Sequence, residues 1–176
     1  GKVSEINDPA CSVFPSYGRA WAQVSNTPFR KYKCRSYEGG ISTPLIVSWK
    51  NNLKNKKGEW CRVPGYLPDI MSTILEATGA PYPETYHGGN KIYPLVGSSL
   101  FPAIQKKTDS LHEYMYWEHQ NNRAIRWGNW KAIRDEKGKE WELYDVVKDR
   151  TERNNLAEQH PEVLTKLVTE WEKWAN

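Results

Sequence analysis

Residues 113–145 read EYMYWEHQNNRAIRWGNWKAIRDEKGKEWELYD. Four short aromatic-rich segments in this stretch alternate with turn-forming residues such as Asn and Gly. Aromatic side chains favour extended chain, and clusters of Asn, Asp and Gly between such segments mark turns. The stretch therefore predicts an antiparallel meander of four strands, over residues 113–118, 123–126, 130–134 and 141–144.

A helix is expected after this meander. Pro161 suits the first helical position, because proline lacks the N–H that would be left without a partner there. The apolar residues that follow recur at helical spacing on one face: Val163, Leu164, Leu167, Val168, Trp171 and Trp174. An apolar stripe of this kind predicts a long C-terminal helix that packs against the small sheet.

The chain before the meander has a different pattern. Residues 44–49 form a continuous apolar run, which predicts a strand buried on both faces, as in a parallel sheet. Residues 67–78 predict a helix with Pro68 in its first turn and Gly79 at its end. Residues 80–110 are rich in Pro and Gly, which predicts a long connection with a short helical turn at 99–105.

Composition limits the possible classes of protein. The chain has 176 residues, a formal net charge of +4 and 9 Trp with 10 Tyr, so aromatic side chains must supply much of its core. No stretch is long and apolar enough for a membrane span. The lysine run at 54–57 predicts a solvated loop and no nucleic-acid partner. The three cysteines have no zinc spacing; one disulfide is possible, with the pair left open.

The stretch with the clearest chemistry is residues 26–44. It is a cationic loop followed by Glu38-Gly39-Gly40 and the entry to the predicted strand. The paired glycines predict a tight loop, because glycine adopts positive φ at low cost. Loops at strand ends often carry active sites. From the residues alone, two hypotheses stay open: an anion-binding site or a solvated basic loop.

The pattern N-T-P-F-R-x-Y-K-x-x-x-Y/H-E-G-G-I-x-T-P over residues 26–44 resembles a region of the type I sulfatases, the formylglycine-dependent arylsulfatases of the alkaline phosphatase superfamily. In those enzymes it precedes a late strand of the large α/β domain. Further motifs of that family follow the same order in this chain. With that first pattern they make five, spread over about residues 18–175; the others lie at 21–25, 68–75, 117–131 and 143–157.

The resemblance implies an alkaline-phosphatase-like α/β fold of which this chain is the C-terminal part. Residues 1–110 would be the remnant of the catalytic domain, with its last strand and helix, and the connection. Residues 111–176 would be an α+β subdomain with a four-stranded antiparallel sheet and a long C-terminal helix. The implied activity is hydrolysis of aryl or carbohydrate sulfate esters by a formylglycine nucleophile upstream of this chain, with calcium or magnesium. This chain is expected to bind neither group and to be inactive alone.

The resemblance also assigns site residues. Lys33 stands five residues before Glu38, where the family places a catalytic lysine that holds a sulfate oxygen and stabilises the leaving oxygen. Arg30 and Lys31 are expected to be surface or structural residues. Cys11 is not expected to be the nucleophile, since the proline after it has the wrong offset and no arginine follows. His119 is a candidate substrate-binding residue that faces the leaving group, with a structural histidine as the alternative.

Two alternative functions stay open. One is a phosphodiesterase or phosphonate hydrolase of the same superfamily. The other is a non-catalytic carbohydrate-binding module with an aromatic platform built from Trp60, Trp117, Trp127 and Trp130. By family resemblance we expect a periplasmic or secreted protein whose targeting signal is not in this chain, a sulfated small molecule or glycan as substrate, and self-association through the incomplete large sheet.

Overall fold

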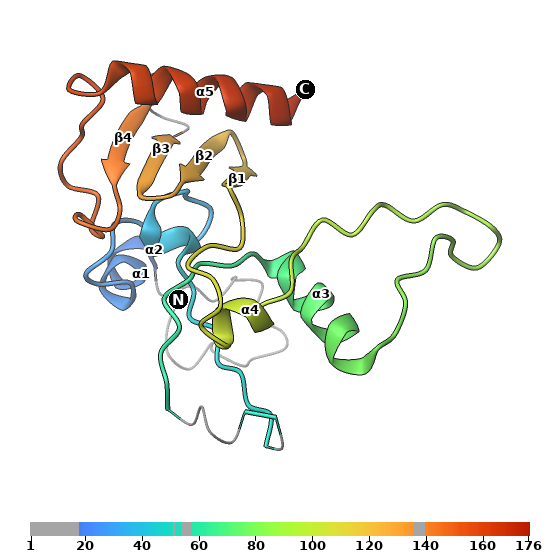
Figure 1. Cartoon of the computed structure of the whole chain (residues 1–176). Coiled ribbons are helices and arrows are strands. Elements are labelled where there is room, and N and C mark those ends of the chain that lie inside the picture. Colours follow the sequence, from blue (N-terminus) through green and yellow to red (C-terminus); the bar gives the residue numbers. More distant parts are fainter. Residues whose placement is uncertain (1–17, 51, 54–57, 136–139) are drawn as a thin grey trace, which may run out of the picture. The chain divides into compact units, whose positions relative to one another are not determined.

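The computed structural model describes residues 18–50, 52–53, 58–135 and 140–176. Cys11 and the lysine run at 54–57 lie outside the described residues. Five helices and four strands are described (Figure 1). In chain order they are α1 (Gly18–Ser25), α2 (Glu38–Ile41), α3 (Leu67–Thr78), α4 (Phe101–Ile104), β1 (Tyr114–His119), β2 (Asn122–Trp127), β3 (Trp130–Arg134), β4 (Glu142–Asp145) and α5 (Pro161–Ala175).

The predicted meander is confirmed. The four strands form one sheet in the order β1-β2-β3-β4. Two-residue turns join β1 to β2 and β2 to β3; in the first, Gln120 and Asn121 both have positive φ, as the tightest hairpin turns require. Between β3 and β4 the register is antiparallel, with Lys131 opposite Tyr144. These two side chains therefore lie on the same face of the sheet.

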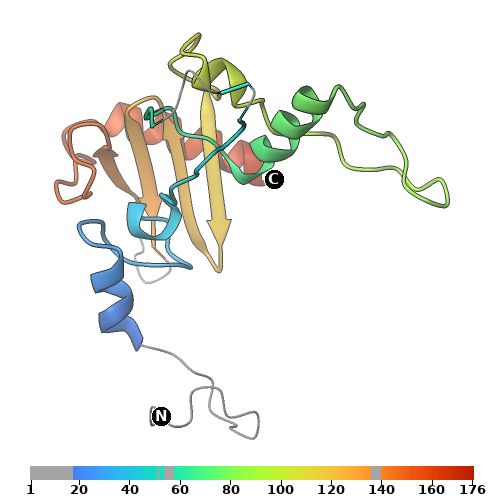
Figure 2. The same cartoon turned by 90° about the horizontal axis from the view of Figure 1, so that it is seen from below.

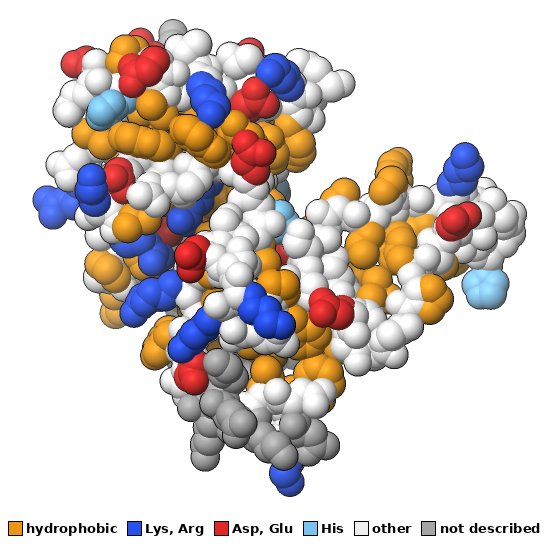
Figure 3. Space-filling view, in the orientation of Figure 1, with side chains coloured by type: hydrophobic (Ala, Val, Ile, Leu, Met, Phe, Trp, Pro, Cys, Tyr) orange, Lys and Arg blue, Asp and Glu red, His pale blue; other side chains and the backbone are white. Residues whose placement is uncertain are grey.

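The predicted C-terminal helix is also confirmed, and it covers one face of the sheet (Figure 2). Leu167 and Trp171 are its buried residues. The Trp171 indole N–H donates to the carbonyl of Trp117 at 3.2 Å, and the Arg123 guanidinium lies 4.6 Å above the Trp171 ring. Hydrophobic side chains fill the layer between α5 and the strands (Figure 3). The opposite face packs around Tyr37, Ile133 and Tyr144.

The chain divides into two compact units. The first unit combines residues 1–44, as far as they are described, with 116–125 and 129–176. The second unit combines 45–115 with 126–128. The first unit thus joins the cationic loop to the sheet and its C-terminal helix, although more than 70 residues separate them along the chain. The assignment of 1–110 and 111–176 to two domains of a larger enzyme stays a prediction.

In the second unit, α3 has the predicted bounds and ends at Gly79, whose φ of 67° is left-handed. The Asp69 carboxylate is fully buried in the first turn of this helix. It accepts the N–H of Tyr66 at 2.6 Å, the N–H of Ser98 at 2.8 Å and a contact of 2.9 Å from Nε2 of His112. The Asp of the family's helix motif is therefore a structural residue that ties three segments together.

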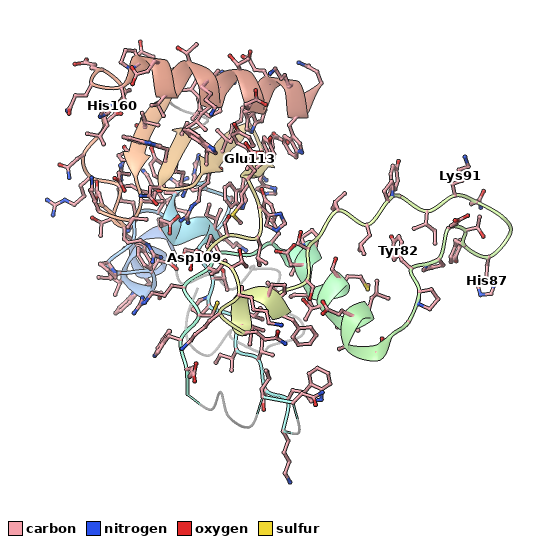
Figure 4. All side chains as sticks on the ribbon, in the orientation of Figure 1. Tyr82, His87, Lys91, Asp109, Glu113 and His160 are labelled. Carbon is pink, nitrogen blue, oxygen red and sulfur yellow. The ribbon has the colours of Figure 1, made fainter. Side chains whose placement is uncertain are left out.

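The connection after α3 is long, as predicted, and α4 is its short helical turn. A single β-bridge between Thr85 and Lys91 closes a small turn within it. Figure 4 shows Tyr82, His87 and Lys91 along this loop, with His87 and Lys91 pointing away from it. Among the described residues, no helix has the length and apolar character that a membrane crossing needs.

The prediction of a strand at 44–49 is wrong for this chain. These residues are irregular, and the side chains of Leu45 and Ile46 are 56% and 91% exposed. A strand is stabilised by hydrogen bonds to neighbouring strands, and no described strand pairs with this segment. The apolar run is typical of a buried strand, but it pairs with none of the strands of the described sheet.

Hydrogen exchange should separate this segment from the sheet. We expect the amides of 44–49 to exchange quickly in the monomeric chain, because they lack backbone partners, and the amides of β2, β3 and α5 to exchange most slowly. Mass-spectrometric hydrogen exchange measures both. Slow exchange across 44–49 in a demonstrated monomer would contradict the open conformation described here.

Candidate active site

Lys33 lies in a four-residue turn formed by Tyr32 to Arg35. The N–H of Arg35 donates to the carbonyl of Tyr32 at 3.2 Å and closes the turn. Cys34, the third residue, has φ of 72°, as the third position of a type II turn requires. Lys33 is the second residue, its side chain is exposed, and no described residue pairs with it. The candidate catalytic ammonium is therefore presented outward.

Gly39 and Gly40 pack closely against the backbone of the loop that contains this turn. They lie in α2 and lack positive φ, so the predicted glycine loop is corrected. Both must be glycine because backbone approaches them closely. A Cβ on Gly39 would lie 2.3 Å from the Arg30 carbonyl oxygen, and one on Gly40 would lie 1.9 Å from that of Arg35. The N–H of Gly39 also donates to the Arg30 carbonyl at 3.0 Å.

A Gly40→Ala variant should therefore be destabilised. The added methyl meets the backbone oxygens of Arg35 and Tyr32, the last and first residues of the turn that carries Lys33. Overpacking of this kind costs about 1–3 kcal/mol in the free energy of unfolding. Urea unfolding of the chain measures the loss. Gly58→Ala is no suitable control because Gly58 has positive φ; Ala20→Ser in α1 is a surface substitution expected to change little.

A buried charge network holds the base of the loop. The Lys131 ammonium on β3 lies 2.9 Å from Oε1 of Glu38 and 2.8 Å from Oε1 of Glu152. The other oxygen of Glu152 accepts the backbone N–H of Glu38 at 2.7 Å. The side chains of Lys131 and Glu152 are fully buried. Arg150 adds a partly exposed contact to Glu38 at 3.2 Å.

In this network the cost of removing charged groups from water is opposed by their contacts with one another. Burial raises the pKa of the Glu152 carboxyl above its ordinary value, while the attraction of Lys131 and the N–H of Glu38 oppose the rise. Each group would cost several kcal/mol if buried alone. Their mutual contacts make the arrangement possible, so α2 is bound to the sheet by groups that must stay together.

A second set of contacts lies beside this network. The Arg30 guanidinium donates to the backbone carbonyl of Glu152 and to the Tyr144 hydroxyl, the latter at 3.1 Å, and stacks 4.4 Å above the Tyr37 ring. The hydroxyls of Tyr37 and Tyr144 both donate to Oε2 of Glu142, at 2.8 and 2.7 Å. Burial, together with that carboxylate, raises the pKa of both tyrosines. Arg30 is thus a structural residue.

The C-terminal family motif also has a structural role. The Asp149 carboxylate accepts the N–H groups of Arg153 and Asn154, both at 2.8 Å. These bonds outweigh the effect of burial and lower the pKa of Asp149. Asn155 accepts the N–H of Leu143 at 3.0 Å. The motif therefore shapes the loop that delivers Glu152 to Lys131.

His119 is the last residue of β1, and its side chain is exposed. Its carbonyl accepts a hydrogen bond from the amide of Asn122 at 3.1 Å. The amide oxygen of Asn122 in turn accepts from the Arg35 guanidinium at 3.1 Å. Arg35 also forms a salt bridge of 2.8 Å with Asp135. The structure therefore joins the hairpin that carries His119 to the turn that carries Lys33.

The four tryptophans of the aromatic-platform hypothesis each have separate surroundings. Trp117 packs against the core, Trp130 contacts the His160 ring at 4.9 Å, and Trp127 stacks on Tyr114 at 6.4 Å. Trp60 is 81% exposed; it belongs with Trp127 to the second unit, whereas Trp117 and Trp130 belong to the first. The arrangement gives no support to a carbohydrate-binding platform of these residues.

Thiols and metal-ligating side chains are two further kinds of group that could take part in chemistry. Cys34 and Cys61 are both free thiols. Within the described ranges, no group of three or more His, Cys, Asp or Glu side chains is placed to hold a metal ion.

The sheet, its C-terminal helix and the motif-bearing loop define the C-terminal part of a sulfatase. A family model described as "N-sulphoglucosamine sulphohydrolase, C-terminal" matches residues 29–175. The chain belongs to this family of sulfatases.

Individual relatives agree with the family. An uncharacterised sulfatase of Schizosaccharomyces pombe is 35% identical in an alignment 166 residues long that covers 88% of this chain. The N-acetylgalactosamine-6-O-sulfatase of Bacteroides thetaiotaomicron is 28% identical in an alignment 156 residues long that covers 79% of this chain. The chain spans 28% of the length of each of these relatives.

A solved structure supports the fold. The structure of Ps i-CgsB in complex with k-i-k-neocarrahexaose matches 84% of this chain with a TM-score of 0.68 and 24% identity, and the match covers 32% of that protein. At this identity the likeness concerns the fold alone.

Neither the Glu38–Lys131–Glu152 network nor the Arg35 contacts were predicted from the amino-acid pattern. A signal was present, because Glu38, Lys131 and Glu152 are charged members of three separate family motifs and none has an assigned chemical role. Charged residues of opposite sign without such a role are candidates for a buried pair. Which of them meet is visible only in the folded chain.

Proposed function

We propose that this chain is the C-terminal part of an enzyme that hydrolyses sulfate esters of aryl or carbohydrate substrates, and that Lys33 is its catalytic contribution. The proposal rests on the conformation of the turn from Tyr32 to Arg35, which holds Lys33. The turn is supported by Gly40, and the Lys33 ammonium is exposed and has no partner among the described residues. A cation held outward at that place is available to an anionic substrate.

The chemistry follows from the charge change in the reaction. As the S–O bond of the ester breaks, the leaving oxygen keeps the electron pair and becomes negative. An ammonium beside that oxygen stabilises the transition state more than the bound ester, which raises kcat. A lysine suits the task as a compact charge with three donors. His119 would contact the leaving group from the hairpin that is bonded to the same turn through Asn122 and Arg35.

The nucleophile and the metal belong to other parts of the proposed enzyme. We place the formylglycine and a calcium or magnesium ion upstream of this chain, and assign no step to a metal held by the described residues. In this proposal residues 1–110 complete the catalytic domain and 111–176 form its subdomain. The enzyme would be periplasmic or secreted, and the exposed run at 44–49 would join the larger sheet or, in this chain alone, promote self-association.

The chain alone should be catalytically silent. We expect no hydrolysis of an activated aryl sulfate above the buffer rate, with or without calcium, because one lysine supplies neither nucleophile nor metal site. A full-length enzyme that contains this sequence should hydrolyse the same ester. Turnover by the chain alone that survives repurification and disappears in Lys33→Ala would contradict the division of roles. A full-length enzyme that cleaves a phosphodiester but no sulfate ester would favour the phosphodiesterase alternative.

A further inference from the structure

We propose that Arg35 is the positioning residue of Lys33, and that it sets the location of the lysine turn by clamping it to the hairpin of β1 and β2 and to the end of β3. The proposal rests on the proposed catalytic role of Lys33. Arg35 would not contact the substrate; it would act by holding the backbone from which Lys33 extends.

First, Arg35 and Lys33 belong to the same four-residue turn. Arg35 is the last residue of the turn in which Lys33 is the second, and its N–H closes that turn. Cys34, between them, has left-handed φ, which is an uncommon conformation for a residue other than glycine. A turn with this conformation needs outside contacts to keep one geometry.

The second step is the side-chain clamp. A single guanidinium nitrogen of Arg35, Nη1, lies 2.8 Å from Oδ1 of Asp135 and 3.1 Å from Oδ1 of Asn122. The Arg35 and Asp135 side chains are only 18% and 15% exposed, and Asn122 is buried. Charge-assisted contacts shielded in this way are stronger and better defined than surface pairs. They bind the turn to two elements of the sheet.

The third step is the opposing support. The Gly40 backbone lies against the Arg35 carbonyl from the α2 side, and Glu38 anchors α2 to Lys131. The turn is thus held between α2 below and the hairpin beside it. Removing the Arg35 side chain breaks only the contacts of the turn with the sheet and leaves its contacts with α2. The fold should therefore remain, while the Lys33 ammonium occupies a wider range of positions.

The test is a double-mutant cycle in the full-length enzyme with an aryl sulfate as substrate. Arg35→Gln alone should lower kcat by about 10–10²-fold, since small misplacements of a catalytic group have effects of this size. In a Lys33→Ala background the same substitution should change kcat by less than about threefold, because no ammonium remains to be positioned. Arg35→Lys should recover most of the loss, because one ammonium nitrogen can donate to both acceptors.

The cycle separates positioning from folding. A general structural defect would lower kcat equally in both backgrounds, so an additive result would overturn the proposal while leaving the role of Lys33 intact. Near wild-type activity of Arg35→Gln would overturn it too. If Lys33→Ala itself keeps nearly full activity, the proposed role of Lys33 fails and the positioning role fails with it.

Two further variants complete the design. Arg153→Gln is the matched control, because Arg153 is exposed in the same unit, and it should leave kcat within about twofold. If Arg35→Gln does not fold, Asp135→Asn tests the same clamp by removing one charge while keeping a hydrogen-bond acceptor. It should show a smaller loss of kcat that also disappears in the Lys33→Ala background, and a loss that persists there would contradict the proposal.

Discussion

Replacing Lys33 with alanine in a full-length enzyme that contains this chain is expected to lower kcat by about 10²–10³-fold, on the order of 3–4 kcal/mol of transition-state stabilisation. The leaving oxygen would then develop its charge without the cation that the turn presents. Lys33→Arg should recover little, because a planar guanidinium does not replace a compact ammonium. Steady-state kinetics on purified enzymes measure the loss.

Lys31 provides the control for this prediction. It is two residues away and half-buried, so Lys31→Ala removes the same kind of side chain without touching the proposed site. We expect its kcat to stay within a few-fold of wild type. The Lys33→Ala loss should also shrink for esters with more acidic leaving groups, which need less stabilisation. A severe loss of kcat in Lys31→Ala with normal kcat in Lys33→Ala would show that the catalytic role was assigned to the wrong lysine of the motif.

Replacing Lys131 with methionine is expected to lower the free energy of unfolding by about 3–5 kcal/mol. The substitution keeps an unbranched side chain one heavy atom shorter but leaves Glu38 and Glu152 buried without their shared cation. Urea unfolding at pH 7 measures the loss. Lys148→Met is the matched control, because the Lys148 side chain, 3.5 Å from Asp145, is 85% exposed, and the substitution should cost less than about 1 kcal/mol.

The pH dependence of this defect has a definite sign. Burial already raises the pKa of Glu152, and removing Lys131 takes away the main opposing attraction. A carboxyl with a folded-state pKa above its unfolded value gives stability that is present below the unfolded pKa and lost as pH rises through the folded one. The Lys131→Met defect should therefore narrow as pH falls from 7 toward 5, and Glu152→Gln should relieve part of it. An equal defect at both values would contradict a buried charge as its cause.

Much of the subdomain follows from local pattern. The aromatic segments and turn residues of 113–145 predicted four strands at nearly their observed bounds, and α3 and α5 lie where their apolar periodicity, Pro68 and Pro161 placed them. These elements were predictable because their hydrogen bonds lie within a helix or between strands joined by short turns. The motif at 26–44 likewise predicted that Lys33 is the residue to examine.

The prediction of a strand at 44–49 was wrong because a strand depends on residues that are distant in the chain. An apolar run indicates burial, but burial and strand pairing depend on partners elsewhere. The described chain provides none, so the same residues are irregular and exposed. Similarly, the glycines of α2 were expected to serve a turn with positive φ, whereas the structure uses their lack of a Cβ to admit the Arg35 and Arg30 carbonyls.

The strands and helices of the C-terminal part, the family motifs and the candidate lysine could all be predicted from the amino-acid pattern, because each depends on residues near one another in the chain. The contacts that hold that lysine in place could not, because they join residues that are far apart in the chain. Glu38 meets Lys131 across 93 positions and Glu152 across 114, and Arg35 meets Asn122 across 87. Such pairs form because packing α2 and its loop against the sheet removes charged groups from water, and a buried charge is stable only beside the partner that the fold brings to it.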